Sequence, residues 1–198
     1  MPAEMTDRFG DAAKWAAELH RDHKRKGNNV PYVSHLFAVA SLVLEDGGSE
    51  DEAIGALLHD AVEDGKTTFG AIRERFGDAV TEIVRTCSDT DGDDNEIVEA
   101  KKPWRERKEA YVAHLHDATD SALRVSNADK VHNARCILAD YREYGDELWT
   151  RFNADAQSAE AQLWYYEQLA DAFSARRAGS PLAKQLRSVV DELRAAAL

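Results

Sequence analysis

The segment Leu57-Leu58-His59-Asp60-Ala61-Val62-Glu63-Asp64 decides how this chain is interpreted. Its leucines, alanine and valine mark a buried element, yet a histidine and three carboxylates stand among them. Burying such groups is costly unless a cation or another partner offsets their desolvation. On a helix, His59 and Glu63 project one turn apart, and so do Asp60 and Asp64. The segment therefore predicts a metal site in which one of the pairs His59-Asp60 and Glu63-Asp64 binds the ion and the other pair meets a substrate.

The sequence on both sides of this segment has a helical period. Four prolines and eleven glycines interrupt it, mostly where helices should begin or end, and no convincing strand is visible. We expect helices at about 6–24, 35–45, 49–62, 68–76, 78 onward, 103–115, 121–141, 155–177 and 181–197. The predicted fold class is all-α, a helical bundle of about ten helices. We expect a single domain over residues 1–198, with its core at about 5–175 and a packing helix at about 181–197.

Composition and charge exclude several classes of protein. The chain has 198 residues, 43% hydrophobic and 31% charged, which is typical of a globular protein with a real core. Its net charge of −12 would repel a phosphate backbone, so we expect no nucleic-acid partner. The apolar run at 36–44 is too short to span a membrane, and the N-terminus lacks the features of a signal peptide. Cys87 and Cys136 have no disulfide-framework or zinc-site spacing, so we expect a cytoplasmic protein.

Three other stretches carry chemically distinctive residues in a fixed order with the first. They are Arg25-Lys26-Gly27, then Pro31-Tyr32-Val33-Ser34-His35, and later Ala128-Asp129-Lys130-Val131-His132-Asn133-Ala134-Arg135. An early histidine, an adjacent His-Asp pair and a later aspartate form a pattern that resembles the HD metal-dependent phosphohydrolases. The four blocks, over about residues 5–175, more narrowly resemble the hydrolase domain of RelA/SpoT alarmone enzymes and the stand-alone small alarmone hydrolases.

The resemblance implies a ligand set of His35, His59, Asp60 and Asp129 for one divalent metal, usually manganese in this family. Imidazole and carboxylate ligands with open positions suit such an ion, and the absence of thiolates argues against a structural zinc. A metal of this kind polarises a phosphate and lowers the pKa of a bound water. The implied reaction is release of pyrophosphate from the 3′ position of (p)ppGpp, giving GDP or GTP.

The same resemblance assigns roles around the metal. Glu63 and Asp64 would flank the water and the leaving group as general base or acid and as orienting group. By themselves these two carboxylates, directly before Gly65, also fit a solvated helix end. Asn133 would hold the substrate or the metal ligands, and Arg25 and Lys26 would sit against the guanine base or its phosphates.

Cations cluster at 20–26 and 101–108 although the chain is acidic, which favours a highly charged small nucleotide as the partner. Lys101 and Lys108 are candidates for substrate binding, and Tyr166 is a candidate for contact with a base. Solvated helix ends are the other interpretation of these cations. Four other histidines are interpreted as packing residues of the core: His20, His23, His114 and His116. His132 is interpreted in a similar way, although it neighbours Asn133 and could shield the site.

Two departures from the alarmone pattern keep other functions open. Ser126 stands where the family commonly has a lysine, and Gln162 where an arginine would fall. Both favour a phosphatase or phosphodiesterase that acts on another nucleotide, such as NADPH or a nucleoside phosphate. A catalytically silent nucleotide-binding regulatory module is a third interpretation. The sequence assigns no oligomeric state.

Overall fold

A computed structural model gives the structure of the chain and describes residues 4–25, 29–64, 66–88, 102–152 and 156–198. Those residues form nine α-helices and one 3-10 helix, and their only β pairing is an isolated bridge between Lys24 and Pro31. The prediction of an all-α fold with about ten helices is confirmed. The chain divides into two compact units, Met1–Glu99 with Thr119–Ala128 and Ala100–Ala118 with Asp129–Leu198. A single domain over residues 1–198 stays a prediction.

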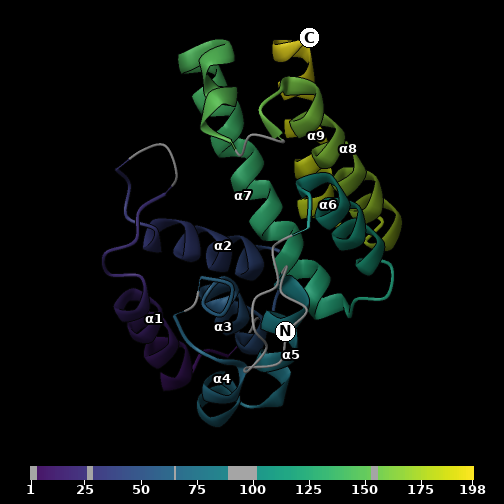
Figure 1. Cartoon of the computed structure of the whole chain (residues 1–198). Helices are drawn as coiled ribbons and strands as arrows, with labels where there is room; N and C mark the ends of the chain where they lie inside the picture. The colour runs from purple at the N-terminus through teal and green to yellow at the C-terminus, as the bar shows by residue number, and fades with distance from the viewer. Residues whose placement is uncertain (1–3, 26–28, 65, 89–101, 153–155) are drawn as a thin grey trace. The chain divides into compact units, whose positions relative to one another are not determined.

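The first unit is built around one short buried helix. Its helices are α1 (Asp7–Leu19), α2 (Val33–Glu45), α3 (Glu50–Leu58), α4 (Phe69–Phe76), α5 (Asp78–Cys87) and the part of α7 (Asp120–Tyr144) that ends at Ala128. Figure 1 shows α3 nearly end-on, and it packs against α1, α2 and α5. Every residue from Glu52 to Leu58 is buried. The packing of α3 therefore determines where the segment that follows Leu58 emerges.

Local signals position this central helix. Ser49 and Glu52 form a capping box, in which the Ser49 hydroxyl accepts from the Glu52 backbone and the Glu52 carboxylate accepts from the Ser49 backbone. Thr68 caps α4 in a similar way by accepting from Ala71 N. Gly77, with a φ of 90°, ends α4 in a conformation that favours glycine. These predicted boundaries are confirmed.

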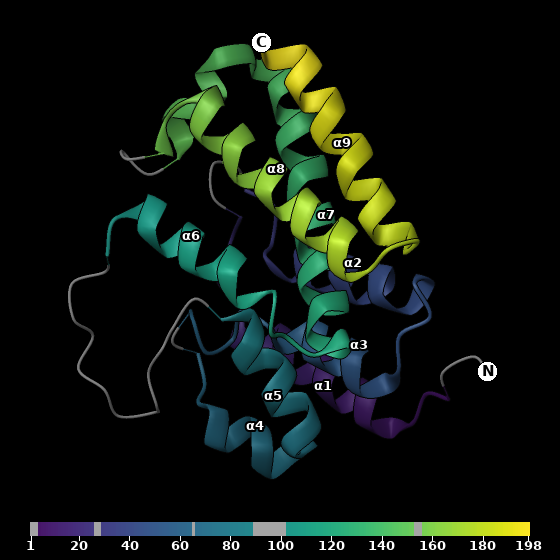
Figure 2. The ribbon, with the colours of Figure 1, turned by 90° about the vertical axis from the view of Figure 1, so that its right-hand side faces the viewer.

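The second unit contains the remaining helices. They are α6 (Trp104–His114), the part of α7 from Asp129, the 3-10 helix η1 (Gly145–Arg151), α8 (Ala159–Arg176) and α9 (Pro181–Ala197). Figure 2 shows α8 and α9 side by side along most of their length, in agreement with their many contacts. Their apolar faces share a cluster with residues of α7 and η1: Leu138, Leu148, Trp149, Ala159, Leu163 and Leu193.

Several predicted helix ends are wrong. Helix α1 ends at Leu19, five residues before the predicted end at residue 24, because His20 leaves helical geometry with φ −106° and ψ 20°. Helix α3 ends at Leu58, so the decisive segment continues as turns. His114 and His116 are exposed, which contradicts their interpretation as core residues. None of the described helices combines the length and the apolar character that crossing a membrane requires.

Candidate metal centre

A short loop between α1 and α2 positions the first candidate residues. The bridge between Lys24 and Pro31 closes this loop, and Arg25 N donates to Val30 O at 2.9 Å. Tyr32 N donates to His23 O at 2.8 Å, which ties the end of the α1 region to the start of α2. Arg25 is half-buried here, whereas Lys26 lies outside the described residues. These hydrogen bonds therefore fix the position of Tyr32 and of the first turn of α2.

Three predicted ligands converge within the first unit. His35, in the first turn of α2, is 1% exposed, and His59, directly after α3, is 3% exposed. His59 Nε2 lies 2.9 Å from Asp60 Oδ2, and His35 Nε2 lies 3.6 Å from the same oxygen. The two imidazole rings meet edge to face, with centroids 5.3 Å apart. The structure thus brings together an imidazole nitrogen from α2 with an imidazole nitrogen and a carboxylate oxygen from the turn after α3.

The donor set fits a divalent metal. His59 Nδ1 lies 2.8 Å from Ala56 O, which accepts its proton and leaves the lone pair on Nε2. Metal-binding histidines are commonly oriented in this way by a backbone carbonyl. Nitrogen and carboxylate ligands without a thiolate suit ions such as Mn²⁺ or Zn²⁺. The Tyr32 hydroxyl also donates to Asp60 Oδ2 and so orients the carboxylate.

The segment after His59 is a series of turns, and this corrects the predicted helical geometry. Ala61 N donates to Leu58 O, three residues earlier, as in a 3-10 helix. Asp64 N donates to Asp60 O, four residues earlier, at 2.9 Å. One helix-like turn therefore remains between Asp60 and Asp64. Glu63 is half-buried and Asp64 is exposed. The two candidate catalytic carboxylates thus project from a turn directly after the candidate metal ligands His59 and Asp60.

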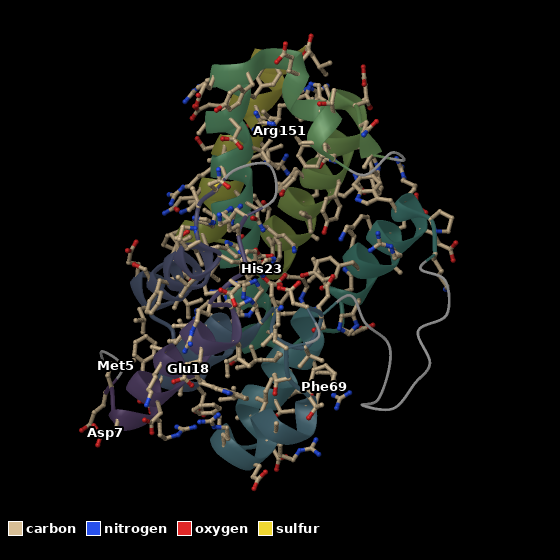
Figure 3. All side chains as sticks on the ribbon, turned by 60° about the vertical axis from the view of Figure 1, so that its left-hand side comes forward. Met5, Asp7, Glu18, His23, Phe69 and Arg151 are labelled. Atoms are coloured by element: carbon tan, nitrogen blue, oxygen red, sulfur yellow. The ribbon has the colours of Figure 1, made fainter. Side chains whose placement is uncertain are left out.

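Asp64 faces two histidines that follow α1. His23 Nδ1 lies 3.2 Å from Asp64 Oδ2, His20 Nδ1 lies 3.7 Å from it, and the two Nδ1 atoms are 3.2 Å apart. Figure 3 labels His23 beyond Glu18, at the opposite end of the α1 region from Asp7. Burial, followed by the charge of His23, lowers the pKa of His20 to about 4, so its imidazole is neutral at pH 7. Burial and the charge of Asp60 raise the pKa of Asp64.

The last predicted ligand begins the second unit's part of α7. Asp129 is 6% exposed and directly follows Ala128 in the helix. Asn133 Nδ2 donates to Asp129 Oδ1 at 2.5 Å, and Lys130 Nζ lies 2.7 Å from Asp129 Oδ2. The predicted placement of Asn133 one turn after Asp129 is confirmed. The side-chain amide of Asn133 therefore orients the carboxylate of Asp129.

The predicted substrate-binding residues of the second unit lie on α6 and α8. Lys108 Nζ lies 5.2 Å from the centroid of the Tyr165 ring, and Tyr166 is 6% exposed with its ring against Tyr165. Lys101 lies outside the described residues. Gln162 is buried and donates from Nε2 to Ala156 O, so it holds the start of α8.

Sequence reasoning missed three residues next to the candidate ligands. The motif Pro31–His35 predicts no role for Tyr32, although its hydroxyl donates a hydrogen bond to Asp60. His20 and His23 were interpreted as packing residues, although both face a predicted catalytic carboxylate. Their spacing of three residues was the available signal, because it places two imidazoles on neighbouring positions wherever the chain turns helically.

The chain is similar in sequence to several curated hydrolases. The chain is 37% identical over 128 residues to the Xenopus tropicalis guanosine-3′,5′-bis(diphosphate) 3′-pyrophosphohydrolase MESH1, and 33% identical to the human protein of that name. These matches cover 63% of this chain and 66% of each relative, so the chain spans just under two thirds of the relatives' length. It is 27% identical over 143 residues to the Escherichia coli bifunctional (p)ppGpp synthase/hydrolase SpoT, covering 69% of this chain and 19% of that protein.

Solved structures show the same fold. A metazoan orthologue of SpoT, described as hydrolysing ppGpp, matches with a TM-score of 0.73 and 21% identity over 96% of this chain and 97% of that one. A Listeria monocytogenes protein matches with a TM-score of 0.64 and 24% identity over 79% and 96% of the two chains. A family model described as the HD domain matches residues 12–157, which include the predicted ligands His35, His59, Asp60 and Asp129. The chain therefore belongs to the HD domain family.

Proposed function

We propose that this chain is a metal-dependent phosphohydrolase that releases pyrophosphate from the 3′ position of guanosine-3′,5′-bis(diphosphate). The observation that carries the proposal is the convergence of His35 Nε2 and His59 Nε2 on Asp60 Oδ2, with the tautomer of His59 set by Ala56 O. The substrate class is supported by relatives at 33–37% identity that carry this activity in their names. A small nucleotide is the proposed partner, the proposed location is the cytoplasm, and residues 1–198 are proposed to act as one domain.

The proposed ligands are His35, His59, Asp60 and Asp129, and the proposed ion is Mn(II). When bound, the ion would polarise the phosphate and lower the pKa of a coordinated water. Asn133 supports the assignment of Asp129, because its amide donates to one carboxylate oxygen and orients the group. Tyr32 does the same for Asp60.

The reaction needs a proton acceptor and a proton donor. Water would form a bond to the phosphorus next to the ribose, the bond between that phosphorus and O3′ would break, and O3′ would take up a proton. We propose Glu63 as the group that accepts the proton of the water and Asp64 as the group that orients or protonates the leaving side. Their position in the turn directly after Asp60 supports these roles.

Cations and aromatic rings would bind the nucleotide. We propose Arg25 and Lys26 for the guanine base or its phosphates, since a planar guanidinium both stacks and pairs with phosphate. Lys101 and Lys108 are proposed for the phosphates and Tyr166 for the base. The half-buried position of Arg25 in a bonded loop supports a fixed role for that side chain.

Another nucleotide is the second candidate substrate, and the burial of two residues favours it. Ser126 is 2% exposed and Gln162 is 4% exposed and bonded to Ala156 O, so neither position offers a cation to a polyphosphate. NADPH or a nucleoside phosphate would need fewer such contacts. The chemistry at the metal would be the same.

The test is hydrolysis by the purified full chain with Mn(II) over a panel of ppGpp, NADPH, nucleoside phosphates and cyclic dinucleotides. Pyrophosphate and phosphate are separated by ion exchange. We expect pyrophosphate from ppGpp, and a loss of hydrolysis of at least roughly 100-fold in Asp60→Asn, because the variant loses a charged metal ligand. His114→Gln changes an exposed histidine and should match the wild type.

Each outcome has a defined meaning. Hydrolysis of NADPH or another nucleotide but not ppGpp would replace the substrate and keep the metal chemistry. Absence of hydrolysis across the panel, with Mn(II) shown to be bound, would overturn the proposal of an enzyme.

A further inference from the structure

We infer that this chain has a second metal site, formed by His20 Nδ1, His23 Nδ1 and Asp64 Oδ2, for a divalent ion of the zinc and cobalt class. The site goes beyond the proposed function and shares only Asp64 with it. All three residues belong to the first unit. Backbone hydrogen bonds hold these residues in place: His20 N donates to Ala16 O, His23 N donates to His20 O, and Asp64 N donates to Asp60 O.

The distances between the three atoms match a metal triangle. They are 3.2 Å between the two Nδ1 atoms, 3.2 Å from His23 Nδ1 to Asp64 Oδ2 and 3.7 Å from His20 Nδ1 to Asp64 Oδ2. Ligand atoms about 2.0–2.1 Å from a tetrahedral zinc ion are about 3.3 Å apart. Each residue uses one and the same atom in its contacts with the other two residues, so a single ion can be bound by His20 Nδ1, His23 Nδ1 and Asp64 Oδ2 together.

Hydrogen bonding alone satisfies this triangle incompletely. Each Nδ1 either carries a proton or presents a lone pair, and the carboxylate oxygen only accepts. A single proton on His23 Nδ1 serves two of the three contacts at most and leaves His20 Nδ1 facing Asp64 Oδ2. Protons on both nitrogens would oppose each other at 3.2 Å. One divalent ion satisfies all three atoms together.

The surrounding structure holds the two imidazoles in place. His23 N donates to His20 O at 3.0 Å, and Tyr32 N donates to His23 O. The Tyr32 ring stacks on the His23 ring with centroids 4.1 Å apart, and the ring planes of the two histidines differ by only 20°. Little conformational entropy would be lost when an ion binds to ligands that are already positioned.

The chemistry of the donors selects the class of ion. Two imidazoles and one carboxylate favour zinc, cobalt or nickel over magnesium or calcium, which prefer oxygen ligands. Three protein ligands leave one tetrahedral position open, as in zinc sites that bind water or substrate. The Asp64 side chain is 29% exposed, so solvent reaches its carboxylate.

The test counts ions in the full chain after metal removal by a chelator. Zn²⁺ is measured by equilibrium dialysis with elemental analysis, and Co²⁺ by the visible absorption of its four-coordinate form. We expect two Zn²⁺ per wild-type chain at a free concentration of about 1 μM. His23→Gln should bind one, and Asp60→Asn should keep the Co²⁺ absorption of the second site. His116→Gln changes an exposed histidine and should bind two.

Thermal unfolding of each metal-free variant shows whether it is folded. Asp64→Asn keeps the size of the side chain and removes its charge, so it provides a second variant that should also lose one ion, and it replaces His23→Gln if that variant does not fold. One Zn²⁺ in the wild type, or two in both His23→Gln and Asp64→Asn, would overturn the inference and leave a hydrogen-bonded cluster. The count is independent of hydrolysis, so a chain that binds two ions without acting on ppGpp would contradict only the proposed function.

Discussion

The phenol of Tyr32 donates a hydrogen bond to Asp60 Oδ2, the carboxylate oxygen that also lies 2.9 Å from His59 Nε2. Tyr32 is the N-cap residue of α2, and His35 follows it in the first turn of that helix. The same ring stacks on His23. One side chain thus links the start of α2, the turn after α3 and the loop after α1.

Tyr32→Phe should weaken metal binding while leaving the fold intact. The variant keeps the aromatic stacking and removes only the hydrogen bond that orients Asp60, and loss of such a partner typically costs roughly 10- to 100-fold in metal affinity. Titration calorimetry with Mn(II) measures the change. Tyr144→Phe alters an exposed tyrosine and serves as the control. Equal affinities in the two variants would show that the Tyr32 hydroxyl has no orienting role.

Arg124→Met should strongly destabilise the first unit. Arg124 Nε lies 3.1 Å from Asp46 Oδ2, and its Nη1 lies 2.5 Å from Glu52 Oε1, while the two carboxylates are only 2% and 5% exposed. Removing the cation takes away the positive charge that faces both buried carboxylates, and breaking a buried ion pair in this way costs about 3–5 kcal/mol. Urea denaturation measures the free energy of unfolding of the variant and of the wild type.

The matched control for Arg124 is Arg142→Met. Arg142 pairs with Glu192, and both side chains are more than half exposed, so its loss should cost less than about 1 kcal/mol. Similar losses in the two variants would mean that the buried carboxylates are stabilised by other groups.

Gly55→Ala should destabilise the contact between α3 and α5. A Cβ at position 55 would lie 2.7 Å from Ile83 Cγ2, which forces the packed helices apart at a cost of about 1–3 kcal/mol. Gly10→Ala adds the same methyl group within α1, where no atom lies within 4 Å, and should stabilise by about 0.5–1 kcal/mol. Thermal melts compare the variants, and changes of the same sign would contradict the close approach at Gly55.

Glu50→Gln should change how stability depends on pH. Glu50 Oε1 accepts from Thr6 N at 2.6 Å, and Arg8 Nη1 lies 3.2 Å from Oε2. Partial burial favours the protonated acid, but the hydrogen bonds from Thr6 and the charge of Arg8 outweigh it. They hold the pKa of Glu50 below its ordinary 4.5.

The sign of the pH effect follows from this lowered pKa. The stabilisation is complete above pH 4.5 and is lost as the pH falls through the native-state pKa, because the unfolded chain then binds the proton more readily. The wild type should exceed Glu50→Gln by about 1 kcal/mol at pH 7, and this difference should shrink in more acidic buffer. A difference that is constant with pH would show that the carboxylate charge is not involved.

Local sequence signals predicted much of the fold. The capping box of Ser49 and Glu52, the stop at Gly77 and the helix Pro181–Ala197 lie where the sequence placed them. Each depends on hydrogen bonds or on side-chain periods within a few residues, so it can be recognised without tertiary information. The predicted ends of α1 and α3 are wrong. The apolar period continues past Leu58 while the chain turns, and the basic residues before Gly27 indicate a later end for α1 than Leu19.

The sequence by itself determined the fold class and, through the order of its motifs, the identity of the candidate ligands. Only the tertiary structure decided that His59 and Asp60 lie in a turn facing His35, and that Asp64 faces His20 and His23. The contact of His35 with Asp60 and the contacts of Asp64 with His23 and His20 join residues 25 to 44 positions apart in the chain. Periodicity describes which face of an element is buried, whereas the meeting of distant side chains depends on how the helices pack.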